Sequence, residues 1–280
     1  MEHKHNLGGN MRLKIFSVLV ILVLMLVCLT GCSNDTKTTE TTDTELTSKN
    51  EVVLQTSENK IDNEVSKSST RVVDTINYEA AAEKQLAKPE KGETVAIIKV
   101  KNYGEIKVKF FEEVAPKAVE NFLTHAKEGY YDGVIFHRVI EEFMIQGGDP
   151  LGTGTGGESI WGEGFGEELD FELVPYRGAL SMASTGKGRN GIGSQFYIVQ
   201  GHYNEEHEAS LKAMNFPEKM IEQYKIHGGY PSSLYLNYTI FGQVYEGMEI
   251  VDKIAEVEVN PENDKPVNDV VIEKITVTKY

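Results

Sequence analysis

The sequence predicts a mainly β protein that forms a closed antiparallel barrel. Short runs of alternating apolar and polar residues recur from residue 94 to residue 277, and only a few segments between them have helical spacing. Many short strands with few helices are typical of antiparallel barrels. The folded domain is expected to span residues 93–280, because the chain before residue 93 is polar or belongs to an export signal.

The first predicted elements are a β-hairpin and a helix. Residues 94–100 and 105–110 alternate apolar and polar side chains on either side of a turn that contains Gly104. Pro116 suits the first position of a helix, apolar residues follow it at helical spacing, and Gly129 ends it.

A second hairpin is predicted over residues 136–147, with Glu141 and Glu142 in its turn. A period of two places Phe136, Arg138 and Ile140 on one face of the first strand and the residues between them on the other. An arginine among apolar neighbours is costly to bury without a partner. We therefore expect Arg138 to face a cleft.

Further elements are predicted towards the C-terminus. Residues 217–227 and 248–254 have helical spacing, and residues 270–277 form a last strand. Residues 202–232 form a charged insertion with helical character. Two interpretations of this insertion stay open, a substrate-selecting helix beside the cleft or a solvated decoration, and the second is favoured.

The N-terminus predicts an exported, membrane-bound protein. An apolar run from residue 11 to residue 28 follows basic residues and ends in the tetrapeptide LTGC, which resembles the bacterial lipobox. This predicts a signal peptide over residues 1–31 and lipidation of Cys32, which would hold the protein at the outer face of a cell membrane. The alternative is an uncleaved membrane anchor.

Residues 32–92 are expected to form a disordered polar linker behind the lipidated cysteine. This segment is rich in Thr, Ser, Asn, Glu, Asp and Lys, so it cannot bury enough apolar surface to offset its ordering entropy. Residues 78–88 predict one short helix within it, ended by Pro89. Besides Cys32 the chain has only Cys28, which would leave with the signal, so no disulfide is expected.

Several motifs in order resemble those of the cyclophilins, the peptidyl-prolyl cis-trans isomerases. They are FHRVIEEFMIQGGD at 136–149, the glycine-rich run at 152–157, GALSMA at 178–183, GSQFYI at 193–198 and YTIFG at 238–242. The resemblance covers residues 93–280. Residues 202–232 resemble an insertion in cyclophilins of Gram-positive bacteria, which implies a Gram-positive host. The family resemblance implies an eight-stranded barrel capped by two helices, with the active site on the outer face of the barrel. It also implies that X–Pro segments of unfolded or exported proteins are the substrates.

The resemblance assigns roles to particular residues. Arg138 would be the catalytic cation, and Gln146 would orient it or contact the substrate. The other implied substrate-binding residues are Phe143, Met144, Tyr197, Leu234 and Tyr238 at the proline, Ala183, Ser184 and Gly154 at the residues before it, and Gln195 beside Gln146. His137 belongs to the motif, and two roles stay open for it, a functional one and a purely structural one.

The chemistry of proline isomerisation agrees with this assignment. The X–Pro bond crosses a barrier of about 18–20 kcal/mol because amide resonance must be broken. A fixed cationic donor can stabilise the twisted amide, so no metal or other cofactor is expected. The net charge of −15 argues against nucleic-acid binding, and the protein is expected to act as a monomer. The alternative function is a non-catalytic chaperone or scaffold that binds proline-containing segments.

Overall fold

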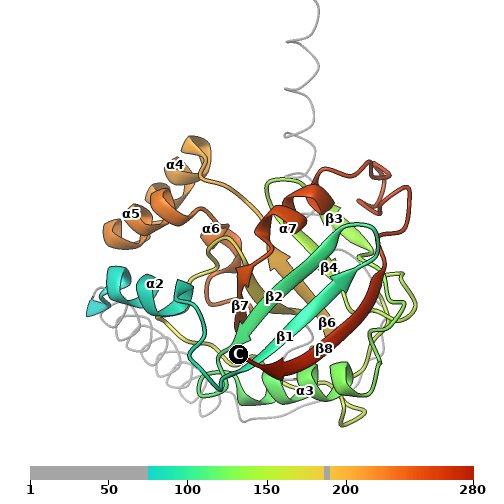
Figure 1. Ribbon diagram of the computed structural model, residues 1–280. Helices are drawn as coiled ribbons and strands as arrows, with labels where there is room; N and C mark the ends of the chain where they lie inside the picture. Colours follow the sequence, from blue (N-terminus) through green and yellow to red (C-terminus); the bar gives the residue numbers. More distant parts are fainter. Residues whose placement is uncertain (1–74, 186–189) are drawn as a thin grey trace, which may run out of the picture. The chain divides into compact units, whose positions relative to one another are not determined.

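The computed structural model describes residues 75–185 and 190–280, which form one sheet with helices around it (Figure 1). Cys32, the expected signal peptide and the linker up to residue 74 lie outside the described residues. Within the described part of the chain, no helix combines the length and apolarity that crossing a membrane requires.

All eight strands of the described residues belong to one antiparallel sheet. Its order is β3-β4-β6-β5-β7-β2-β1-β8. The strands are β1 (Thr94–Val100), β2 (Gly104–Phe110), β3 (Arg138–Ile140), β4 (Met144–Gly147), β5 (Ala179–Ser184), β6 (Ile192–Val199), β7 (Ile240–Glu246) and β8 (Ile272–Lys279). The two predicted hairpins are confirmed as β1–β2 and β3–β4, and the predicted last strand as β8.

The prediction of a closed barrel is wrong, because β3 and β8 are the two edges of an open, curled sheet. Just before these strands begin, backbone hydrogen bonds between residues 133–136 and 270–272 span the gap around an isolated bridge between Ile135 and Val271. Farther along, the amide of Val139 donates to the carbonyl of Asp264, 2.8 Å away. The loop before β8 therefore occupies the position that a closing strand would need, and β3, with three residues, is too short to extend the pairing.

Two amphipathic helices enclose the core of the curled sheet, as the resemblance implies. Helix α3 (Pro116–Lys127) starts at its proline and is followed by Gly129, which has a positive φ of 73°. Helix α7 (Met248–Ala255) lies at the other end of the sheet (Figure 1). Phe122 from α3 and Val251 and Ile254 from α7 are fully buried against inward-facing strand residues. Burial of these apolar faces is what holds both helices on the sheet.

Four more helices gather on one side of the sheet (Figure 1). They are α2 (Tyr78–Leu86), α4 (Glu205–Ala213), α5 (Glu218–His227) and α6 (Pro231–Leu234). The predicted helices at 78–88, 217–227 and 248–254 are confirmed as α2, α5 and α7, whereas α4 and α6 were not predicted individually. Tyr78 and Ala82 of α2 are buried against Val174 and Met220, so the folded domain includes α2 and begins before residue 93.

Candidate active site

The period of two along each strand separates the core from a second apolar cluster on the outer face of the sheet. On β6, Phe196 and Ile198 belong to the core, whereas Tyr197 and Val199 belong to the outer cluster. On β4, Met144 likewise lies outside the core. Consecutive side chains of a strand point to opposite faces, so the sequence pattern itself places an apolar surface outside the sheet.

Arg138, Gln146 and Tyr197 form a row across three neighbouring strands. Arg138 pairs with Gln146, and Gln146 pairs with Tyr197. The expectation that Phe136 shares a face with Arg138 is wrong, because Phe136 is buried in the core together with Val139. Strand β3 begins only at Arg138, so the alternation does not extend back to Phe136.

A cavity of about 190 Å³ lies over this row. Three of its side chains, Met144, Tyr197 and Leu234, are at most 4% exposed and give it an apolar floor. Arg138 and Gln146 supply polar groups at its wall. The cavity is lined by Arg138, Phe143, Met144, Gln146, Ala183, Ser184, Tyr197, Leu234 and Tyr238. The structure thus brings together residues from β3, β4, β5, β6, α6 and the segment before β7.

The remaining predicted site residues within the described chain, Gly154 and Gln195, line an adjoining cavity of about 390 Å³. The two cavities share Gln146, Ala183 and Ser184. Gln146 Nε2 donates to Gln195 Oε1 over 2.9 Å, and Gln195 Nε2 donates to the carbonyl of Gly154 over 3.1 Å. The side chain of Gln146 is therefore hydrogen-bonded to Gln195 and the glycine-rich loop.

Arg138 has one hydrogen-bonding side-chain partner among the described residues. Its Nε lies 3.4 Å from Oδ2 of Asp264, and both side chains are about 40% exposed, at 42% and 38%. An ion pair of this length and exposure contributes little to stability. Asp264 thus contacts the guanidinium at Nε, and the two terminal nitrogens of Arg138 can donate to a ligand in the cavity. No local pattern pointed to Asp264, because it lies 126 positions away from Arg138 along the chain.

Asp149 is a second residue that the sequence reasoning missed. Its side chain is buried, and it accepts hydrogen bonds from the amides of Leu151, Thr153, Gly154 and Gly156 at 2.7–3.2 Å. Burial alone would raise the pKa of this carboxyl, but the four amides outweigh it and hold the pKa below its usual value. Asp149 thereby fixes the glycine-rich loop that holds Gln195. The sequence Gly-Gly-Asp-Pro just before the glycine-rich run was the local pattern that could have pointed to Asp149.

His137 lines neither cavity. It is 5% exposed, and neither ring nitrogen has a hydrogen-bond partner among the described residues. Burial lowers its pKa, which favours the neutral imidazole. The ring lies beside Gly154, where an added Cβ would come within 3.4 Å of it. This position makes His137 a packing residue beneath the glycine-rich loop.

The described residues contain no group of three or more His, Cys, Asp or Glu side chains arranged to hold a metal ion. The functional arrangement therefore consists of an apolar cavity, one guanidinium at its wall, and a hydrogen-bonded glutamine pair that leads into a polar cavity. Such a site can hold a compact apolar ring and present a cationic donor to a polar atom beside it.

Comparison with known proteins agrees with this geometry. The family model for cyclophilin type peptidyl-prolyl cis-trans isomerases matches residues 95–277. A protein of Staphylococcus epidermidis named as a peptidyl-prolyl cis-trans isomerase is 47% identical over 194 residues, which are 69% of this chain and 96% of the relative. A protein of the same name from Staphylococcus aureus is 45% identical over the same shares of the two chains.

Solved structures give the same result for the fold. The chain is similar to a cyclophilin-type isomerase of Cryptosporidium parvum determined in the presence of the dipeptide Ala-Pro, with a TM-score of 0.53 and 35% identity. That likeness covers 66% of this chain and 99% of the other. A second structure of the C. parvum protein gives a TM-score of 0.54 at 35% identity, over 68% and 99% of the two chains.

Proposed function

The chain belongs to the cyclophilin-type peptidyl-prolyl cis-trans isomerases and is an enzyme of that activity, and we propose that it assists the folding of exported proteins at the outer face of the cell membrane. In this proposal Arg138 stabilises the twisted prolyl amide, and the cavity of about 190 Å³ holds the proline ring. The observation that supports this assignment of Arg138 and the cavity is the apolar floor of the cavity with a guanidinium at its wall.

The physical argument starts from amide resonance. Rotation about the X–Pro bond breaks the conjugation of the nitrogen lone pair, and the nitrogen becomes a hydrogen-bond acceptor only in the twisted state. A donor aimed at that nitrogen therefore binds the transition state better than either planar isomer. Arg138 suits this role because its guanidinium is permanently charged and its fork of donors lies at the cavity wall. No covalent step is required.

In this proposal the peptide runs across the two adjoining cavities in one direction. With the proline ring on Met144, Tyr197 and Leu234, the residues before proline extend past Ala183 and Ser184 towards Gly154. The hydrogen-bonded pair of Gln146 and Gln195 lies between the two cavities. We propose that this pair contacts the peptide backbone and that Asp149 keeps the far wall in place.

The catalytic proposal is tested by NMR exchange or a protease-coupled assay on a short Ala-Pro peptide, with residues 75–280. We expect strong acceleration of cis–trans exchange, and a folded domain without acceleration would instead support a non-catalytic chaperone or scaffold. The alternative also predicts that the peptide still binds, which chemical-shift titration measures.

Replacing Cys32 with serine tests the proposed location. The resemblance of residues 29–32 to a lipobox supports lipidation at this cysteine, and two acyl chains provide stable anchoring. We expect the wild-type chain, expressed in a Gram-positive host, to incorporate labelled palmitate and to sediment with membranes. The Cys32→Ser variant should incorporate no label and lose most of its membrane association. Cys28→Ser is the matched control and should behave as wild type; equal labelling of wild type and Cys32→Ser would refute the anchor.

A further inference from the structure

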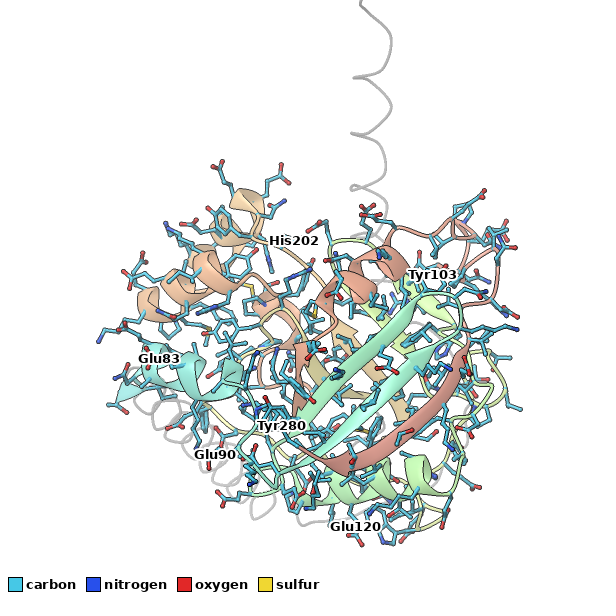
Figure 2. The ribbon with its side chains drawn as sticks, viewed as in Figure 1. Glu83, Glu90, Tyr103, Glu120, His202 and Tyr280 are labelled. Carbon is cyan, nitrogen blue, oxygen red and sulfur yellow. The ribbon has the colours of Figure 1, made fainter. Side chains whose placement is uncertain are left out.

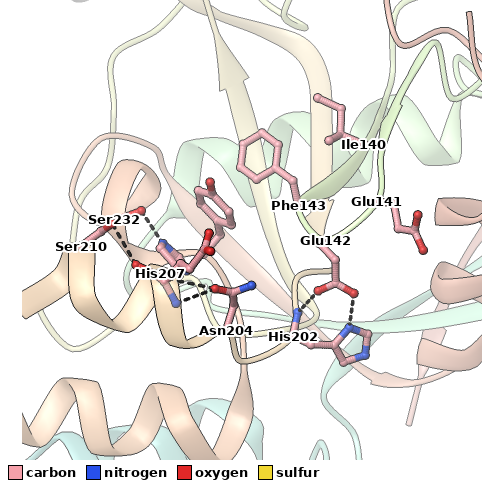
Figure 3. Close-up of a pocket in the computed structure, with 11 residues that line it drawn as sticks. Ile140, Glu141, Glu142, Phe143, His202, Asn204, His207, Ser210 and Ser232 are labelled. Atoms are coloured by element: carbon pink, nitrogen blue, oxygen red, sulfur yellow. Dashed lines mark hydrogen bonds and ion pairs between the residues drawn. The ribbon is translucent and has the colours of Figure 1, made fainter. Parts of the chain in front are cut away.

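A third cavity, of about 490 Å³, adjoins the cavity that is proposed to hold the proline ring, which is called the proline cavity from here on. Phe143 lines both cavities. One side of the third cavity comes from the end of β3 and the turn that follows, with Ile140 and Glu141, and the other from the insertion, with Asn204 and His207 (Figure 3). The insertion therefore contributes directly to a hollow that borders the site.

An aromatic chain connects the insertion to the proline cavity. The ring of Phe143 packs edge-on against Tyr230 with centroids 4.6 Å apart, and Tyr230 packs against His207 with centroids 4.2 Å apart. His207 is held from both ring nitrogens, because Nδ1 lies 2.9 Å from the hydroxyl of Tyr224 and Nε2 contacts the hydroxyl of Ser232. The wall of the third cavity is thus built from fixed aromatic rings.

The charged groups that line the cavity are mainly acidic. Glu141 and Glu206 are exposed and form no ion pair within the described part of the chain. Glu142 accepts a hydrogen bond from the amide of His202 at 2.9 Å and contacts its imidazole at the same distance. Figure 2 shows His202 on the segment that leads into α4. Carboxylates next to fixed aromatic rings favour a cationic side chain, through ion pairing and cation–π contact.

The order of the cavities gives the position of that cation in the substrate. The cavity with Gly154 and Gln195 shares three lining residues with the proline cavity. The third cavity, called the acidic cavity from here on, shares Phe143 with the proline cavity. The proline cavity lies between them. If the residues before proline occupy the Gly154 side, as the proposed function has it, the residues after proline run past Phe143 towards α4.

We propose that the acidic cavity is a subsite for a lysine or arginine side chain in the residues that follow the substrate proline, and that Glu141 and Glu206 select it. This inference rests on the proposed isomerase function and assigns the insertion a part in substrate selection. Residues 202–232 would then act in substrate selection rather than as a solvated decoration.

The acidic residues of α4 also have a simpler explanation, which the experiment must separate. Glu205, Glu206 and Glu208 lie in the first turn of α4, where carboxylates are favourable next to the positive end of the helix dipole. Glu205 is in the same turn and does not line the cavity. A variant at Glu205 therefore reproduces the change in charge and helix dipole without changing the cavity.

The test compares kcat/KM for Ala-Ala-Pro-Lys-Lys and Ala-Ala-Pro-Gln-Gln by NMR exchange at low salt. We expect the wild type to prefer the lysine peptide by about fivefold, with less preference at 1 M salt. The Glu141→Gln/Glu206→Gln variant should lose this preference. The charge-matched Glu205→Gln/Glu222→Gln variant should keep it, because Glu222 is exposed on α5 and, like Glu205, does not line the cavity. Lys-Lys-Ala-Pro-Gln-Gln, with its lysines before the proline, should show no preference over its glutamine counterpart.

The outcomes separate this inference from the proposed function. Equal rates for the lysine and glutamine peptides in the wild type would overturn the subsite and leave the isomerase standing. Loss of the preference in both double variants would overturn it too, since long-range charge would then be the cause. A preference for lysines before the proline would overturn the assigned direction. Absence of isomerisation with every peptide would instead count against the proposed function, on which the inference rests.

Discussion

Replacing Arg138 with alanine is expected to lower kcat/KM for Ala-Pro isomerisation by about 10²- to 10³-fold. This is the range for removal of one preorganised donor that stabilises a transition state. The fold should be retained, because the side chain is 42% exposed and makes one long ion pair with Asp264. Thermal unfolding and near-ultraviolet circular dichroism should therefore match those of the wild type, with a stability change of at most about 1 kcal/mol.

Arg138→Lys separates the charge from the geometry of the guanidinium. Lysine keeps the positive charge but loses the planar fork of donors. We expect it to recover part of the loss and to remain about tenfold below the wild type, since hydrogen-bond geometry at the amide nitrogen matters as well as charge. Activity of Arg138→Ala within threefold of the wild type would contradict the assigned role. Equal activity of the lysine variant and the wild type would show that charge alone is sufficient.

Replacing Asp149 with alanine is expected to lower the free energy of unfolding by about 3 kcal/mol. Four backbone amides lose their acceptor, and a buried donor left without a partner costs roughly 1–3 kcal/mol, although amides at the loop surface can turn to water. For a domain of this size the midpoint of thermal unfolding should fall by about 6–12 °C. Asp269→Ala removes an exposed carboxylate and serves as the control, with an expected change near zero. An unchanged midpoint for Asp149→Ala would show that the loop does not depend on this carboxylate.

The stability that Asp149 provides should also depend on pH in a defined direction. Its pKa in the folded protein lies below the reference value of 3.8, so the unfolded chain takes up its proton first. The contribution of the carboxylate is therefore fully present above that reference value and is lost as the pH falls through the lower folded pKa. The difference in unfolding free energy between the wild type and Asp149→Asn should be constant near neutral pH and should shrink below about pH 4. Urea unfolding across that range measures it, and a difference that grows on acidification would contradict the sign.

Local patterns predicted much of this molecule. The alternation in β1 and β2, the proline and glycine that bound α3, and the glutamate turn of the second hairpin all act over a few residues, and the structure has them where they were expected. The family motifs likewise identified side chains that the structure gathers into two adjoining cavities.

The errors concern interactions between distant parts of the chain. Closure of the sheet depends on whether residues near 136 and 271 continue to pair, and no local pattern reports that the loop at 260–267 intervenes. The position of Phe136 depends on where β3 begins. Residues 78–86 were read as a helix inside a linker, because the tyrosines and apolar residues that bury Tyr78 come from far along the chain. Asp264 went unnoticed for the same reason.

The open edge of the sheet has a consequence for how this enzyme can be tuned. The carbonyl of Asp264 accepts a hydrogen bond from the amide of Val139, and its carboxylate accepts one from Nε of Arg138. A single residue of a surface loop thus contacts both the β3 edge of the open sheet and the guanidinium of Arg138. Lengthening or shortening that loop should alter turnover before it alters thermal stability, because the core does not pass through it. We expect variation in this loop to adjust the rate of the enzyme without any change in the residues that line the proline cavity.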